Sequence, residues 1–220
     1  MSKEDGTLNR IYRNNVVHID AFAEDYSYFG NSLIDMYEAS FDSKYLELAK
    51  NYADILVEQF YADGQFKQSL SKNIVINSGN SMDNATPSYN FMCSLLLIRL
   101  HHYYGNKKYR EIVEASMEKA GVYINKYPHA HSTAIFVNRY LSEGPHEIAL
   151  STIDGDNSLL KVIRDKYLPC KIIAETSSDL DIPLLKDKGP LGGKSTAYIC
   201  KNYACKEPVT DDKTLEDQLK

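Results

Sequence analysis

A polar loop that leads straight into an apolar helix reads Asp83-Asn84-Ala85-Thr86-Pro87-Ser88-Tyr89-Asn90. Aspartate and asparagine ahead of a helix accept hydrogen bonds from its free backbone N–H groups, and proline is tolerated in the first turn. A second polar helix start lies about one repeat earlier, at Glu24-Asp25-Tyr26-Ser27-Tyr28. Two polar starts at a fixed offset predict that both segments line one rim of a helical array.

Apolar residues recur at helical spacing on both sides of this loop, and short turns separate the periodic stretches. The first stretch carries the stripe Phe22, Tyr26, Phe29, Leu33 and Tyr37. The pattern predicts five helices in antiparallel hairpins, with approximate bounds 22–37, 45–60, 88–104, 107–126 and 132–141. Residues 1–17 are polar and we expect them to be irregular, whereas 65–76 alternates loosely and indicates a short extended segment.

The two hairpins also match each other along the sequence. When the chain is shifted by 64 residues, Leu33-Ile34 falls on Leu97-Ile98 and Lys44-Tyr45 falls on Lys108-Tyr109. Internal matches of this kind are typical of repeated supersecondary units. The repeat predicts that the first helices of the two hairpins run parallel, so that their polar starts share one end of the array.

The pattern changes after Gly144-Pro145. Two strand-like stretches, 146–153 and 171–174, flank a predicted helix at 157–167, which is the order of a βαβ unit. A further strand is expected at 196–201, and Asp211 is a capping residue for a short last helix. We therefore divide the chain into a mainly α-helical hairpin array, residues 1–144, and a small α/β segment, residues 145–220.

The composition favours a soluble, cytoplasmic protein without nucleic-acid or membrane partners. Its formal net charge is −5, whereas a nucleic-acid binder needs a basic face. No run approaches the roughly 18 to 20 apolar residues of a membrane span, and Met1–Gly6 lacks the apolar core of a signal peptide.

The four cysteines, Cys93, Cys170, Cys200 and Cys205, are too few for a disulfide framework. A structural zinc site needs a second closely spaced pair beside Cys200 and Cys205, and none is present. We expect no metal and no cofactor. Cys200 and Cys205 are a redox candidate as a reversible disulfide, and the alternative is a plain structural turn.

Four segments in order resemble the C-terminal half of the spermatogenesis-associated, thioredoxin-domain-containing protein family. The resembling segments are 21–26, 33–42, 83–90 and 197–210, which together extend over nearly the whole chain. One departure is Tyr89 in Ser88-Tyr89-Asn90, where the family more usually has glycine.

The resemblance implies a longer protein, with a thioredoxin-like domain followed by an (α/α)6 six-hairpin toroid related in architecture to acylglucosamine 2-epimerases. It also implies a carbohydrate-active role. The fold class we expect is thus mainly α, a partial toroid followed by the small α/β segment. Because the chain has neither a thioredoxin-like segment nor a Cys-x-x-Cys motif, we expect a split or truncated product. Such a product needs its missing half as a partner, or it associates with itself.

Three acids are the catalytic candidates: Glu24, Asp25 and Asp83. Neighbouring side chains on a helix diverge by about 100°, so Glu24 and Asp25 cannot both face one point. An acid from each helix start could form the carboxylate pair of glycoside hydrolysis, about 5 to 9.5 Å apart. The alternative is capping, because acids at a helix start accept backbone N–H bonds and suit the helix dipole.

Further polar residues near the same rim are candidates for substrate binding: His18, Tyr26, Asn84, Ser88 and Asn90. His18 lies just ahead of the first polar start, and epimerases of this architecture move a proton with histidine. Tyrosine suits a sugar ring, although most of the 17 tyrosines are explained by packing.

Three functions follow from these observations. The first is a sugar-binding or carbohydrate-active six-hairpin protein, epimerase- or glycosidase-like, with enzymatic activity only in a complete toroid. The second is a non-enzymatic helical scaffold that completes a larger assembly with the missing N-terminal half. The third is a thiol-dependent role of Cys200 and Cys205.

Overall fold

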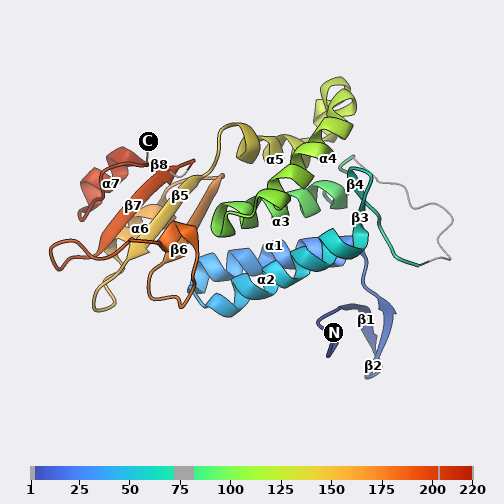
Figure 1. Ribbon diagram of the computed structural model, residues 1–220, viewed down its shortest axis with the longest axis horizontal. Helices are drawn as coiled ribbons and strands as arrows, with labels where there is room; N and C mark the ends of the chain where they lie inside the picture. Colours follow the sequence, from blue (N-terminus) through green and yellow to red (C-terminus); the bar gives the residue numbers. More distant parts are fainter. Residues whose placement is uncertain (1–2, 72–81, 203, 220) are drawn as a thin grey trace.

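The structure is a computed structural model that describes residues 3–71, 82–202 and 204–219. A layer of helices lies beside a small mixed sheet, and a thin β-hairpin projects from the helical end (Figure 1). The helical layer contains α1 (Ala23–Ser40), α2 (Ser43–Ile55), α3 (Tyr89–Tyr104), α4 (Lys107–Lys126) and α5 (Ser132–Ser142). These are the five helices that the apolar periodicity predicts.

Short irregular helices and strands connect the main helices. A π-helical turn continues α2, a tight two-stranded turn follows it, and a 3-10 turn precedes α5. Their bounds are η1 (Leu56–Phe60), β3 (Tyr61–Ala62), β4 (Gln65–Phe66) and η2 (Pro128–Ala130). The expected extended segment is thus present at its start, in β4, while residues 72–76 lie outside the described part of the chain.

The two hairpins turn in the same way, which supports the repeat. Phe41 and Gly105 end α1 and α3 with left-handed backbone, at φ 57° and 67°. Asp42 and Asn106 then cap α2 and α4 by accepting the backbone N–H of Lys44 and Lys108, respectively. The residues of each pair are 64 positions apart. The same capping chemistry therefore closes both hairpins.

Side-chain contacts show that α1 and α3 are parallel, as the repeat predicts. The Tyr28 hydroxyl donates to the carbonyl of Pro87 (2.6 Å), near the start of both helices. One to two turns further on, the Asn31 amide donates to the carbonyl of Met92 (3.0 Å). Still further on, Arg99 reaches Asp35. Because the contacts advance in the same direction on both helices, the two polar starts share one end of the layer.

Asp83 joins α5 to this arrangement. Its Oδ1 accepts the backbone N–H of Ser88 (2.7 Å), ahead of α3, and its Oδ2 accepts that of Thr133 (2.8 Å), in the first turn of α5. Near the end of α5, the Tyr140 hydroxyl donates to the carbonyl of Lys171, which also contacts the end of α1. The helices α1, α3 and α5 thus form a parallel row, and α2 and α4 lie against it.

The C-terminal sheet packs one face on the helical layer. Its strands β5 (His146–Ser151), β6 (Lys171–Glu175), β7 (Thr196–Lys201) and β8 (Ala204–Cys205) have the order β6-β5-β7-β8. β5 and β6 are parallel and α6 (Ser158–Asp165) connects them, so the predicted βαβ unit is confirmed. The 3-10 turn η3 (Pro183–Leu185) follows β6, and α7 (Asp212–Gln218), capped by Asp211 as predicted, ends the chain.

Alternation along the strands separates two apolar clusters. Ala149 and Ile172 face the helical core, while Ile148 and Ile173 face the opposite cluster that α6 and α7 cover. One core is therefore shared by the helical layer and the sheet. The division at residue 144 marks a change of secondary structure, and its status as a domain boundary stays a prediction, as does the toroid.

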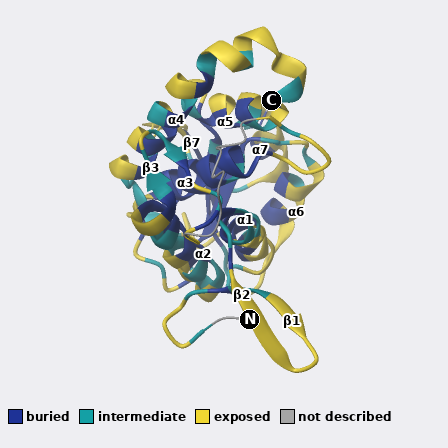
Figure 2. Ribbon diagram, turned by 90° about the vertical axis from the view of Figure 1, so that its right-hand side faces the viewer, coloured by how far each residue is buried: buried dark blue, intermediate teal, exposed yellow. Residues whose placement is uncertain are grey.

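The N-terminal segment corrects one expectation. The polar sequence of residues 1–17 predicts an irregular segment, but β1 (Asn9–Arg13) and β2 (Val16–Asp20) pair as an antiparallel hairpin. Asn14 and Asn15 form its two-residue turn with positive φ (51° and 60°), which is the backbone of a type I′ turn. The hairpin stands apart from the body and is almost entirely exposed (Figure 2).

Phe29 corrects a second expectation. The apolar spacing predicts that Phe29 belongs to the buried stripe of the first helix, but its side chain is 43% exposed and its ring lies 5.6 Å from that of Tyr52 in α2. The buried face of α1 includes Gly30 and Ile34, and Gly30 lies against Leu96 of α3. Among the described residues, no helix combines the length and apolar character that crossing a membrane requires.

We expect Asp83→Ala to lower the free energy of unfolding by about 1–2 kcal/mol, because two backbone N–H groups at two helix starts lose their acceptor. Asn84→Ala is the matched control, since Asn84 is exposed and only its backbone makes a described hydrogen bond. Urea denaturation of both variants checks this. Equal stability losses would contradict the capping role of Asp83.

Candidate functional site

The acids predicted at the start of α1 are held by an arginine of the hairpin. Arg10 places Nη2 2.5 Å from Glu24 Oε1 and Nη1 2.9 Å from Asp25 Oδ2, while its guanidinium lies over the ring of Phe22. Asp25 also accepts the backbone N–H of Phe22 (2.8 Å), as a capping residue does. Both carboxylates therefore have partners that fix the hairpin and the helix start.

The other predicted residues near this rim are also engaged in packing. Tyr26 is buried and its hydroxyl accepts the backbone N–H of Leu8 (2.9 Å). Asn90 is buried and its Oδ1 accepts the backbone N–H of Phe66 (2.8 Å). Ser88 is buried beside Asp83, Asn84 is exposed, and His18 is exposed on β2.

The structure brings the two polar helix starts together, but among the described cavities their residues line two different ones. Tyr26 lines a cavity of about 510 Å³ beneath the hairpin. Asn90 lines a separate cavity of about 330 Å³ beside α4. Catalytic roles for Glu24, Asp25 and Asp83 stay a prediction, and the contacts described above favour the capping alternative for Asp25 and Asp83.

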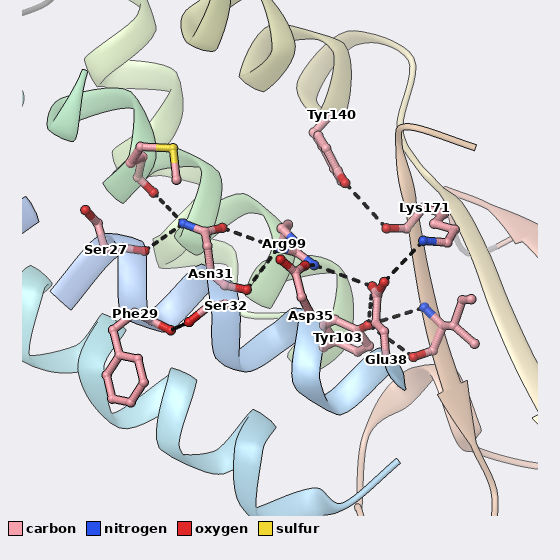
Figure 3. A network of polar contacts seen from close by, with 12 residues as sticks. Ser27, Phe29, Asn31, Ser32, Asp35, Glu38, Arg99, Tyr103, Tyr140 and Lys171 are labelled. Atoms are coloured by element: carbon pink, nitrogen blue, oxygen red, sulfur yellow. Dashed lines mark hydrogen bonds and ion pairs between the residues drawn. The ribbon is translucent and has the colours of Figure 1, made fainter. Parts of the chain in front are cut away.

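A different polar cluster lies further along the row of parallel helices. We call Asp35, Glu38, Arg99 and Lys171 the Arg99 cluster; they come from α1, α3 and β6 (Figure 3). They line a cavity of about 280 Å³ together with side chains of all three parallel helices. The remaining lining residues are Asn31, Met92, Leu95, Phe136, Tyr140 and Pro169.

Arg99 is the centre of this cluster. Its side chain is only 9% exposed, and Nη2 lies 2.6 Å from Asp35 Oδ1 and 3.6 Å from Glu38 Oε1. Burial alone lowers the pKa of Arg99, but the carboxylates of Glu38 and Asp35 outweigh it and raise the pKa above its ordinary value. The guanidinium is therefore charged, and the two acids compensate the cost of burying it.

The two acids differ in how firmly they are held. Glu38, 10% exposed, receives a hydrogen bond from the Tyr103 hydroxyl (2.9 Å) and an ion pair from Lys171 Nζ (3.3 Å). The Tyr103 hydroxyl in turn accepts the backbone N–H of Ile173 in β6 (3.2 Å). Burial, and after it the negative charge of Glu38, raises the pKa of Tyr103 well above its ordinary value. Asp35 is 68% exposed, and its only described partner is Arg99.

One donor of Arg99 is unused. Its Nε is buried and has no hydrogen-bond partner in the described part of the structure. An unsatisfied buried donor is costly, so such an atom indicates a place where an acceptor belongs. Phe136 and Tyr140 of α5 add aromatic side chains to the lining of the same cavity.

Sequence reasoning missed the Arg99 cluster although two signals were present. Arg99 interrupts the apolar run Leu95-Leu96-Leu97-Ile98, where a charge is out of place unless it is paired. The 64-residue shift also places Asp35 on Arg99, so that equivalent positions of the two hairpins carry opposite charges. Both signals lie in a helix interior, whereas the candidate residues predicted from the sequence lie at or near helix starts.

Cys200 and Cys205 are joined by a disulfide in this structure. They face each other across β7 and β8, and the Nζ of Lys188 lies 3.4 Å from the Cys205 sulfur. A redox role of this pair stays a prediction. Within the described ranges, no three or more His, Cys, Asp or Glu side chains gather as metal ligands.

The chain is similar to proteins whose names match the resemblance seen in the sequence. It is 27% identical over 215 residues to spermatogenesis-associated protein 20 of Homo sapiens, covering 90% of this chain and 27% of that protein. The figures are the same for spermatogenesis-associated protein 20 of Rattus norvegicus. Similarity to the uncharacterized protein B0495.5 of Caenorhabditis elegans is 24% over 212 residues, covering 90% of this chain and 28% of that protein.

These relatives support the family that the four segments indicated. The chain spans about a quarter of the length of the curated relatives it matches. No family model matches the chain.

We expect Glu38→Gln to lower the free energy of unfolding by about 3 kcal/mol, because it removes the buried carboxylate that compensates Arg99. Asp35→Asn is the matched control, and we expect a loss below about 1 kcal/mol because Asp35 is exposed. Denaturant unfolding measures both. A loss for Asp35→Asn as large as that for Glu38→Gln would contradict the central role of Glu38.

Proposed function

We propose that this chain forms one wall of a sugar-binding cavity within a helical protein of the spermatogenesis-associated type. The observation that carries the proposal is the cavity lined jointly by α1, α3 and α5, with the charged Arg99 cluster on it and the buried Arg99 Nε unsatisfied. Three parallel helices contribute to it, as expected for the inner row of a toroid.

The lining suits a small ligand that carries hydroxyl groups and an apolar ring face. Asp35 offers a solvent-exposed acceptor, while Arg99 and Lys171 offer donors. Phe136 and Tyr140 offer aromatic surface for the ring. A volume of about 280 Å³ is close to the lower end of ligand pockets, so a monosaccharide fits better than a longer chain.

Binding and catalysis are separate claims. Epimerase- or glycosidase-like catalysis is proposed only for an assembly that supplies the remaining hairpins of a toroid. The chain alone supplies the wall, its donors and its acceptors, and binding is therefore the property to measure first.

We expect Met92→Trp to weaken binding of every sugar that binds the chain by at least about tenfold, because the indole occupies the cavity that Met92 lines. Val122→Trp is the control, since Val122 is exposed on α4 and does not line this cavity. Calorimetric titration with neutral and acidic monosaccharides measures both. Absence of binding, or equal binding by both variants, would refute the proposal.

A second role, as a helical scaffold in a larger assembly, is favoured by the hairpin β1–β2. Five of its side chains are large, apolar and exposed: Ile11, Tyr12, Val16, Val17 and Ile19. A two-stranded hairpin alone is marginally stable, and exposed apolar ribbons associate with other surfaces. We propose that the hairpin is the surface through which copies of the chain associate.

We expect the chain to self-associate with rising concentration, and the double variant Tyr12→Ser, Val17→Ser to shift it toward monomer, because these cross-strand neighbours lose exposed apolar area. Tyr167→Ser is the control, since Tyr167 is also exposed but lies beyond the end of α6. Sedimentation velocity measures the distribution. A wild-type chain that stays monomeric throughout would refute the association.

A further inference from the structure

We infer that the ligand of the Arg99 cavity is an acidic sugar, whose carboxylate replaces Asp35 on the guanidinium of Arg99. This inference rests on the proposed function, because it needs the cavity to bind a small sugar. It adds the chemical class of that ligand and the side chain that gives way to it.

Of the two acids that contact Arg99, Asp35 is the one that can leave it. Glu38 is fixed by Tyr103 and Lys171 and lies almost out of solvent. Asp35 has the opposite character, since its side chain is 68% exposed and is described with no partner besides Arg99. Swinging Asp35 into water therefore costs one ion pair, while its carboxylate regains full hydration.

A ligand carboxylate can accept one more hydrogen bond from Arg99 than Asp35 does. Nε and Nη2 form one edge of a guanidinium, and a carboxylate that lies flat against this edge accepts from both nitrogens. Asp35 takes only Nη2 of Arg99, at 2.6 Å, and leaves the buried Nε without an acceptor. A ligand carboxylate that takes both nitrogens gains a second charge-assisted bond and satisfies the buried donor.

The charges that line the cavity favour a ligand with one carboxylate. With Asp35 in solvent, the cavity holds the cations Arg99 and Lys171 and the anion Glu38. The lining then carries a net charge of one positive unit, which a ligand with a single carboxylate neutralises. A neutral sugar leaves Asp35 on Arg99 and Nε unsatisfied, whereas a phosphate brings close to two negative charges.

Titration of the intact 220-residue chain with glucuronate, glucose and glucose 6-phosphate tests the inference. We expect glucuronate to bind at least about tenfold more tightly than glucose. We expect Arg99→Lys to abolish this preference, because lysine keeps the positive charge but lacks the two adjacent N–H donors that a carboxylate accepts from. Equal affinity for glucose and glucuronate, or a preference for glucose 6-phosphate, would overturn the carboxylate assignment.

Asp35→Ala gives a readout that does not depend on the fold of the Arg99→Lys variant. Because it removes the competing carboxylate, it should strengthen glucuronate binding several-fold, whereas glucose, for which Asp35 is a hydroxyl acceptor, should not bind more tightly. Glu58→Ala removes one exposed negative charge outside the cavity and should change neither, since surface charges are screened at physiological salt. Weaker glucuronate binding by Asp35→Ala would overturn the inference.

The outcomes separate this inference from the proposed function. If glucose binds as tightly as glucuronate and Met92→Trp blocks both, the proposed sugar cavity is supported and the assignment of an acidic ligand is refuted. If none of the three ligands binds the wild-type chain, the sugar cavity itself is wrong and the inference goes with it.

Discussion

The burial of one guanidinium group constrains the rest of this structure. Arg99 lies in α3, which is packed on several sides, and its charge must be met by acids from a neighbouring element. Glu38 meets it only if α1 runs parallel to α3 in the observed register. Because Glu38 also binds Lys171 and shares Tyr103 with the backbone of β6, the same contact docks the sheet on the helical layer.

Much of the helical layer could be predicted from the sequence, because its signals are local or repeat. Apolar spacing marks the five helices, and Asp42 and Asn106 mark the second helix of each hairpin by capping chemistry. The hairpin β1–β2 was missed because its apolar residues are exposed and lack the polar alternation of a half-buried strand. The Asn14-Asn15 turn was its clearest local signal.

The candidate site was harder to predict, because an acid at a helix start has two explanations that the sequence does not separate. Asp25 and Asp83 carry the residue types of both capping and catalysis, and only the partners of their carboxylate oxygens distinguish these roles. The Arg99 cluster is assembled from positions far apart in the chain. Its geometry depends on the docking of β6, which no local pattern specifies.

The opposite charges at Asp35 and Arg99 make the contact between the hairpins directional. These residues occupy equivalent positions of the two hairpins. The first hairpin therefore contributes an acid to the contact, and the second contributes a base. Contacts of this head-to-tail kind have no internal two-fold axis, and they extend until a ring closes or a different element terminates the series. In this chain the sheet packs across the ends of the parallel helices, where Lys171 of β6 pairs with Glu38 near the end of α1 and accepts a hydrogen bond from Tyr140 near the end of α5.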